Sequence, residues 1–280
     1  MRFSIEKGGS MQARYPKEGP LCERSPYAII DHSNACDGYM IVRVFDEDPL
    51  KKFQIQVTQD VKHQNFVAHP VHKEVYIPMV YGSGDYKIFV CRNIVGSTYS
   101  YVLSLSKKVE LKDEFSPWLG PTAYAKYNKD SNCVKLAEQV CKNCLTDFDR
   151  MKAILTKVMD SLVYDTYLAQ TVSNKVAFWV PNPDEVLKAG KSICYGYSSL
   201  AAAMWRSQGI PAKIVVGYAG RVYHAWNLVY LENGGSLLPG FYIKPREWTL
   251  IDSTFADTGG SIRAFYDFAA ENDYKVDYYG

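Results

Sequence analysis

The hydrophobic pattern of this chain changes from a strand period to a helix period near residues 113–122. Before this stretch, apolar and polar residues alternate, which is typical of strands with one face in a core. After it, apolar residues recur every three or four positions, which is typical of amphipathic helices. All five tryptophans lie at or after Trp118. The change predicts an all-β part followed by a part that contains helices.

We therefore divide the chain into three segments. Residues 1–25 are polar and contain two prolines, and we expect a tail or an extended arm. Residues 26–115 are expected to form a small immunoglobulin-like β-sandwich, although the core tryptophan of a true immunoglobulin domain is missing. Residues 116–280 are expected to form an α+β domain. Strands of the sandwich are predicted at 38–45, 53–57, 75–80, 86–90 and 99–105.

The third segment shows helices first and strands afterwards. Thr146 is a predicted N-cap, with Asp149 in the position where a capping box has Glu or Gln. The residues before Gly209 are rich in Ala, Leu and Met and predict a buried helix. Helices are predicted at 134–141, 147–164, 183–190 and 195–208, and strands at 212–218, 222–231 and 247–251.

The composition excludes several classes of protein. The net charge is +2 and no run of Lys or Arg stands out, so nucleic-acid binding is not indicated. No stretch of about 18 apolar residues is present, so no membrane-spanning helix is predicted. Residues 1–25 contain no continuous apolar segment. We therefore predict no signal peptide, which fits either a cytoplasmic protein or a secreted one whose signal was removed before this numbering begins.

Three residues in the third segment have the side chains that acyl transfer needs. Cys194 opens the predicted helix 195–208, His224 lies in a predicted strand, and Asp252 ends another. They can supply a nucleophile, a base that activates it and a group that orients the base. His224 is the only histidine after His72. The seven cysteines are an odd number, so at least one is unpaired.

The predicted elements favour this chemistry. A thiol at a helix N-terminus lies near unpaired N–H groups and the positive end of the helix dipole, and both favour the thiolate. The same N–H groups can hold the oxyanion of a tetrahedral intermediate. If the strands of His224 and Asp252 pair, the two side chains can share a face, whereas a slip of one residue would separate them.

Each of the three residues also has a purely structural explanation. A cysteine at a helix start is more often a small buried side chain, a strand histidine is more often structural, and an aspartate before Ser-Thr is ordinarily a turn residue. The joint arrangement favours catalysis. The alternative function is an inactive binding or scaffold protein, but such a protein usually loses one of the three residues.

Residues 183–254 carry several separate motifs that resemble the transglutaminase-like family of the papain-type cysteine protease superfamily. They are Gly190–Leu200 (GKSICYGYSSL), Gly209–Tyr218 (GIPAKIVVGY), His224–Asn227 (HAWN) and Trp248–Thr254 (WTLIDST). The resemblance implies that Cys194 is the nucleophile, His224 the base and Asp252 the orienting acid. It also implies a central helix at 195–208 packed on an antiparallel sheet, and it covers roughly residues 130–260.

The resemblance implies less about the reaction. Family members hydrolyse amide bonds, cross-link proteins or deamidate side chains, so these three reactions stay open. The resemblance implies a peptide or protein substrate and no cofactor. An aromatic or amide side chain upstream of the cysteine often completes the oxyanion hole, and Tyr164, Asn174 and Trp179 are candidates. With Trp179, the neighbours Tyr195 and Trp226 are candidates for the oxyanion hole or the substrate groove. The β segment resembles the small β-sandwich often attached to bacterial members and is the candidate surface for a partner or cell-wall contact.

Other groups of possible ligands carry a weaker prediction. Cys141 and Cys144 form a CxxC pair, but a zinc site needs four ligands and only Cys133 lies near in sequence. We expect structural thiols there. The histidines of the β segment are expected on its surface, so no metal site is predicted; they are His63, His69 and His72.

Overall fold

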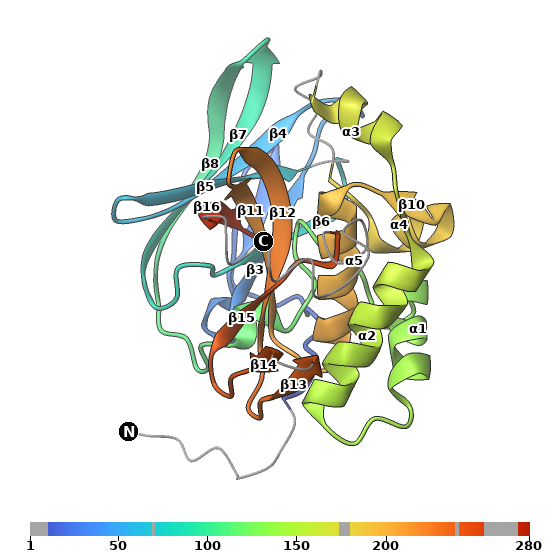
Figure 1. Ribbon diagram of the computed structural model, residues 1–280. Helices are drawn as coiled ribbons and strands as arrows, with labels where there is room; N and C mark the ends of the chain where they lie inside the picture. The colour runs from blue at the N-terminus through green and yellow to red at the C-terminus, as the bar shows by residue number, and fades with distance from the viewer. Residues whose placement is uncertain (1–10, 69–70, 174–179, 239–240, 255–273) are drawn as a thin grey trace.

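The computed structural model describes residues 11–68, 71–173, 180–238, 241–254 and 274–280. The first part of the chain forms two four-stranded antiparallel sheets, and the second part forms helices around a third four-stranded antiparallel sheet. Figure 1 shows the strands of the first part, blue to teal, beside the helices, green to orange. The expected α+β class with a preceding strand-rich region is confirmed.

The two sheets of the first part are packed through alternating apolar side chains. In β4, Phe53, Ile55 and Val57 are fully or almost fully buried, while the residues between them are half-buried. All five predicted strands are present. The first sheet has the order β1-β2-β3-β6, with β1 Cys22–Arg24, β2 Ala28–Asp31, β3 Tyr39–Val44 and β6 Glu74–Pro78. The second has the order β5-β4-β7-β8, with β4 Phe53–Gln59, β5 Lys62–Ala68, β7 Gly84–Val95 and β8 Thr98–Val109.

Strands β1, β2 and β5 were not predicted. β5 begins Lys-His-Gln-Asn and therefore lacks a clear apolar alternation, because its first buried position is the polar Gln64, before Phe66 and Ala68. Short 3-10 helices at Ala35–Asp37 (η1) and Ser116–Trp118 (η2) complete the elements before the helical part.

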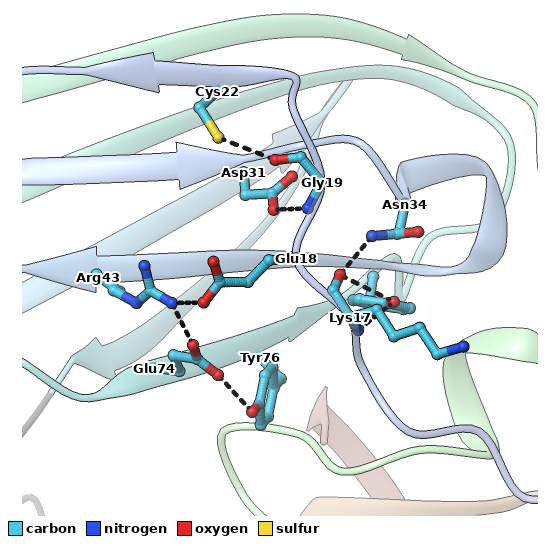
Figure 2. A network of polar contacts seen from close by, with 10 residues as sticks. Lys17, Glu18, Gly19, Cys22, Asp31, Asn34, Arg43, Glu74 and Tyr76 are labelled. Carbon is cyan, nitrogen blue, oxygen red and sulfur yellow. Dashed lines mark hydrogen bonds and ion pairs between the residues drawn. The ribbon is translucent and has the colours of Figure 1, made fainter.

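Residues 11–21 form an arm that lies against both parts of the chain. The N–H of Arg14 donates to the carbonyl of Leu119 at 2.8 Å, and its guanidinium pairs with Asp113 at 3.0 Å. Figure 2 shows the following residues lying across the first sheet, where the N–H of Gly19 donates to Asp31 at 2.7 Å. Arg43 pairs there with Glu18 and with Glu74. The division of the chain into three segments stays a prediction.

The helical part contains the four predicted helices and one that was not predicted, α3. The capping box at Thr146 is present: its Oγ1 accepts from the N–H of Asp149 at 3.1 Å, and its own N–H donates to the Asp149 carboxylate at 3.1 Å. The helices are α1 Asn132–Cys141, α2 Asp147–Ser161, α3 Thr166–Ser173, α4 Pro183–Ala189 and α5 Cys194–Ser207. Among the described residues, none of the helices is long and apolar enough to cross a lipid bilayer.

Helix α2 ends three residues before its predicted end, and this matters for the site. Leu162 is extended, and the next two residues form the short strand β9, Val163–Tyr164. β9 pairs in parallel with β10, Lys191–Ser192, which leads directly into α5. Strand pairing at long range thus overrides the helical pattern of the local sequence.

Helix α5 lies between the third sheet and the α1–α2 pair (Figure 1). The Asn227 side chain donates from the sheet to the carbonyl of Ser198 at 3.1 Å, and the Trp205 indole donates to the carbonyl of Met151 in α2 at 3.1 Å. The sheet has the order β15-β12-β11-β16, with β11 Ala212–Ala219, β12 Val222–Tyr230, β15 Trp248–Ile251 and β16 Tyr274–Tyr279; β13 Gly235–Leu238 and β14 Phe241–Ile243 form a separate hairpin.

Candidate active site

Cys194 is the first residue of α5 and is half-buried. The preceding residue, Ile193, is extended and continues from β10. The first N–H groups of a helix have no acceptor within the helix, so the thiol lies beside donors that point out of the α5 N-terminus. The helix begins here because the pairing of β10 with β9 fixes the entering chain.

Gly196 allows α5 to start this close to β10. A Cβ at this position would collide with Oγ of Ser192 and lie 2.6 Å from its Cβ. Ser192 is itself buried, at 1% exposed. The glycine is required for the close approach of strand and helix and not for an unusual backbone angle.

We expect Gly196→Ala to destabilise the fold by about 1–3 kcal/mol, because the added methyl group overpacks a buried contact. The free energy of unfolding in urea measures this. A Ser192→Gly substitution in the same chain removes both clashing atoms, so the double variant should regain part of the lost stability. Wild-type stability of Gly196→Ala alone would contradict the packing argument.

His224 and Asp252 come together through the register of two neighbouring strands. β12 pairs antiparallel with β15, with Asn227 opposite Ile251. The next pair along this register is Trp226 opposite Asp252. Side chains alternate along a strand, so His224, two residues before Trp226, lies on the same face as Trp226. His224 Nε2 donates to Asp252 Oδ2 at 2.5 Å, and Asp252 is 1% exposed. The predicted shared face is confirmed.

His224 also forms a side-chain hydrogen bond with Cys194. Since Nε2 faces Asp252, Nδ1 is the ring nitrogen left for the sulfur. Burial by itself lowers the pKa of His224, but the hydrogen bonds and charges of Asp252 and Cys194 outweigh it and raise the pKa to about 10. The imidazolium form is therefore favoured at neutral pH, and an imidazolium beside a thiol stabilises the thiolate.

Two aromatic side chains enclose the His–Asp pair. Trp226 is 1% exposed, stacks near His224 with ring centroids 6.2 Å apart, and meets Tyr274 edge-to-face at 4.8 Å. The Tyr274 hydroxyl donates to Asp252 Oδ2 at 3.5 Å. Tyr274 comes from β16, which pairs with β11. Tyr274 was not predicted, because no local sequence pattern places residue 274 beside residue 252.

The residues predicted for the oxyanion hole or the substrate groove lie in different surroundings. Trp226 belongs to the site, but as a buried support of His224; with almost no exposed surface it does not line a groove, which corrects that prediction. Tyr195 is half-buried, with its ring 6.1 Å from that of Tyr124, and its role stays a prediction. Trp179 and Asn174 lie outside the described residues. Tyr164 is half-buried within electrostatic reach of Cys194, which adds to burial in raising the pKa of Tyr164.

The groups considered as metal ligands form no metal site among the described residues. In the described parts of the chain, no set of three or more His, Cys, Asp or Glu side chains is arranged to hold a metal ion. Burial, and then the neighbouring Cys144, raises the pKa of Cys141 to about 12, which fits a structural thiol. His63 and His72 are exposed, as predicted, and His69 lies outside the described residues.

Comparison with known proteins points to one family. Residues 134–252 match the family model of the transglutaminase-like superfamily, and the match includes Cys194, His224 and Asp252. Human kyphoscoliosis peptidase is 29% identical over 133 residues, which are 43% of this chain and 18% of that protein. This chain thus spans less than a fifth of the length of that relative.

Two solved structures are also similar. A candidate cysteine protease from Cytophaga hutchinsonii is 15% identical, with a TM-score of 0.40 over 85% of this chain and 70% of the other. Red sea bream transglutaminase is 11% identical, with a TM-score of 0.34 over 77% and 48%. At such low TM-scores neither likeness bears on the reaction. The likeness to the transglutaminase-like superfamily therefore lies in residues 134–252, which include the central helix α5 and strands β11, β12 and β15 described above.

Proposed function

We propose that this chain is a thiol-dependent enzyme that acts on amide bonds of peptides or proteins, with Cys194 as nucleophile, His224 as base and Asp252 as the group that orients the base. One observation carries the proposal: a single imidazole bonds to the buried Asp252 carboxylate through Nε2 and also to the thiol at the start of α5. The superfamily match supports it, since that superfamily is generally one of cysteine peptidases and acyltransferases.

The reaction begins from a thiolate–imidazolium pair. Cys194 Sγ attacks the amide carbonyl carbon, and the C=O electrons move to oxygen, where N–H groups at the α5 N-terminus stabilise the charge. As the C–N bond breaks, the leaving amine takes the proton from His224, and a thioester remains on Cys194. Water or a second amine then attacks the thioester while His224 accepts its proton, and the thiolate leaves.

Asp252 and its surroundings hold the imidazole in this geometry. Its carboxylate accepts from Nε2, which leaves Nδ1 to exchange the proton with sulfur and substrate. Trp226 covers one side of the ring, and a covered hydrogen bond in a low dielectric is stronger than an exposed one. Hydrolysis and transfer to an amine share these steps and differ only in the second nucleophile.

The proposal is tested by labelling all seven cysteines with iodoacetamide and measuring each rate by mass spectrometry. We expect Cys194 to react fastest of the seven, because the imidazolium of His224 lies beside its sulfur. His224→Ala should lower the labelling rate of Cys194 by about 100-fold, because the imidazolium is missing. The half-buried Cys144 serves as the internal comparison, and its rate should not change. Equal rates at Cys194 and Cys144 in the wild-type protein would favour an inactive scaffold instead.

A further inference from the structure

The β11–β12 hairpin carries exposed apolar side chains beside the candidate site. Tyr218 is 43% exposed, Val222 62% and Tyr223 54%. The strand register places Tyr218 opposite Tyr223, and the next pair is Gly217 opposite His224. Large apolar side chains that are exposed together next to a reactive centre indicate a contact surface more strongly than scattered ones do. Val222 directly precedes Tyr223 in β12, so its side chain lies on the other face of the hairpin. We therefore call the tyrosine pair, Tyr218 and Tyr223, the hairpin surface.

The tyrosines of the hairpin surface are held in place from below. Tyr223 and Tyr218 meet edge-to-face with ring centroids 5.2 Å apart, and Tyr223 is hydrogen-bonded to Tyr278 of β16. The Tyr278 ring packs 5.6 Å from Tyr124, which in turn lies 6.1 Å from Tyr195, the residue after Cys194. A continuous set of rings therefore connects the exposed pair with the start of α5. Rings fixed in this way offer contact area with little loss of conformational entropy on binding.

Electrostatic contact also places Tyr223 near the nucleophile. Burial raises the pKa of Tyr223, and the charges of Asp277, Tyr218 and Cys194 add to the rise. The hydroxyl is thus neutral at physiological pH and lies within reach of the charge on the sulfur. The charged residues around the hairpin surface have both signs, with Arg221 in the turn and Lys275 and Asp277 on β16. The surface is therefore suited to apolar contact and not to a strongly charged ligand.

We propose that Tyr218 and Tyr223 bind the substrate segment next to the reacting amide and select peptides that carry an aromatic side chain there. The inference rests on the proposed function, because the occupant is defined by its attachment to Cys194. An aromatic ring against the tyrosine pair gains edge-to-face contact and excludes water from both partners. A short acidic or amide side chain at the same place gains neither.

Two peptidyl chloromethyl ketones that differ in one residue test this: acetyl-Phe-Gly and acetyl-Asn-Gly chloromethyl ketone. Each alkylates Cys194, and peptide mapping gives the second-order rate. Each rate is divided by the iodoacetamide rate of the same variant, so that general changes in thiol reactivity cancel. In the wild-type protein we expect the Phe probe to react about three- to tenfold faster, the factor that one aromatic contact supplies. In the double variant Tyr218→Ser/Tyr223→Ser the ratio should fall to nearly one.

Tyr101→Ser is the matched control. Tyr101 is also an exposed tyrosine, 67% accessible, in a cross-strand aromatic pair with Phe89 at 5.2 Å, but it lies in the first part of the chain. Its variant should keep the wild-type ratio. If the double variant does not fold, Tyr218→Ser alone removes one ring of the pair and should lower the ratio by a smaller factor.

The outcomes separate this inference from the proposed function. Equal rates for the two probes in the wild-type protein, with iodoacetamide labelling still dependent on His224, overturn the hairpin surface and leave the proposed function standing. A preference that survives in the double variant overturns it too. A dimer in light scattering that the double variant abolishes would assign the surface to a second copy of the chain. Loss of the His224 dependence itself contradicts the proposed function, whatever the probes show.

Discussion

Replacing Cys194 with Ala is expected to abolish amide turnover while the protein stays folded. The thiolate forms the covalent bond of the proposed intermediate, and no neighbouring group in the site replaces it. Removal of a catalytic nucleophile lowers turnover by roughly 10⁴- to 10⁶-fold. Alanine fits at the first position of a helix, and Cys194 is only half-buried, so the unfolding free energy should change little.

Three assays in parallel measure this effect and also separate the reactions that remain open. Fluorophore release from a peptide–aminocoumarin library reports hydrolysis, ammonia release from glutamine peptides reports deamidation, and amine incorporation into casein reports cross-linking. Cys144→Ala, which removes another half-buried thiol, is the matched control and should keep full activity. Undiminished turnover by the Cys194→Ala protein in whichever assay is positive would refute the thioester mechanism.

Asp252→Asn is expected to lower turnover by about 10⁴-fold, because an amide in place of the carboxylate no longer selects the productive tautomer of His224. The change in the barrier corresponds to about 5.5 kcal/mol. The substitution keeps the shape of the side chain, so the loss reflects charge and hydrogen bonding and not packing.

The pH dependence of turnover is a second measurement on Asp252→Asn, and the direction of its change can be predicted. Asp252 is one of the groups that raise the pKa of His224 to about 10. Without its charge the pKa of the ring falls, so the imidazolium form is lost at a lower pH than in the wild type. Because the leaving amine takes its proton from the imidazolium, the alkaline limb of the pH profile of turnover should move to lower pH. An unchanged rate and an unchanged limb in Asp252→Asn would remove Asp252 from the mechanism.

A buried carboxylate elsewhere serves as control. Asp46 has a side chain that is 5% exposed and pairs with Arg92 at 2.5 Å in the first part of the chain. Asp46→Asn breaks this pair and should reduce stability, yet turnover per folded molecule should stay the same. Equal losses of turnover in the two variants would show that the Asp252 effect is one of stability alone.

Local patterns were sufficient for much of the fold and for the identities of the candidate residues. Sequence patterns placed five of the eight strands in the first part and four of the helices, since burial of one face imposes its repeat on nearby residues. The capping box at Thr146 formed with Asp149 despite the shorter side chain. Cys194 was placed at a helix start and His224 in a strand because both positions follow from segments of a few residues.

The tertiary structure alone decided which residues meet. The register of β12 and β15 brings Asp252 to Nε2 of His224, and β16 adds Tyr274 from a distant point of the chain. Arg206 is the clearest exception to local expectation. It is fully buried, and it donates to the carbonyls of Ala212, Gly120 and Gly280 and to Thr122 Oγ1. A buried guanidinium is stable only where several hydrogen-bond acceptors surround it. These acceptors come from distant parts of the chain and meet only in the folded protein, so no local sequence pattern predicts them.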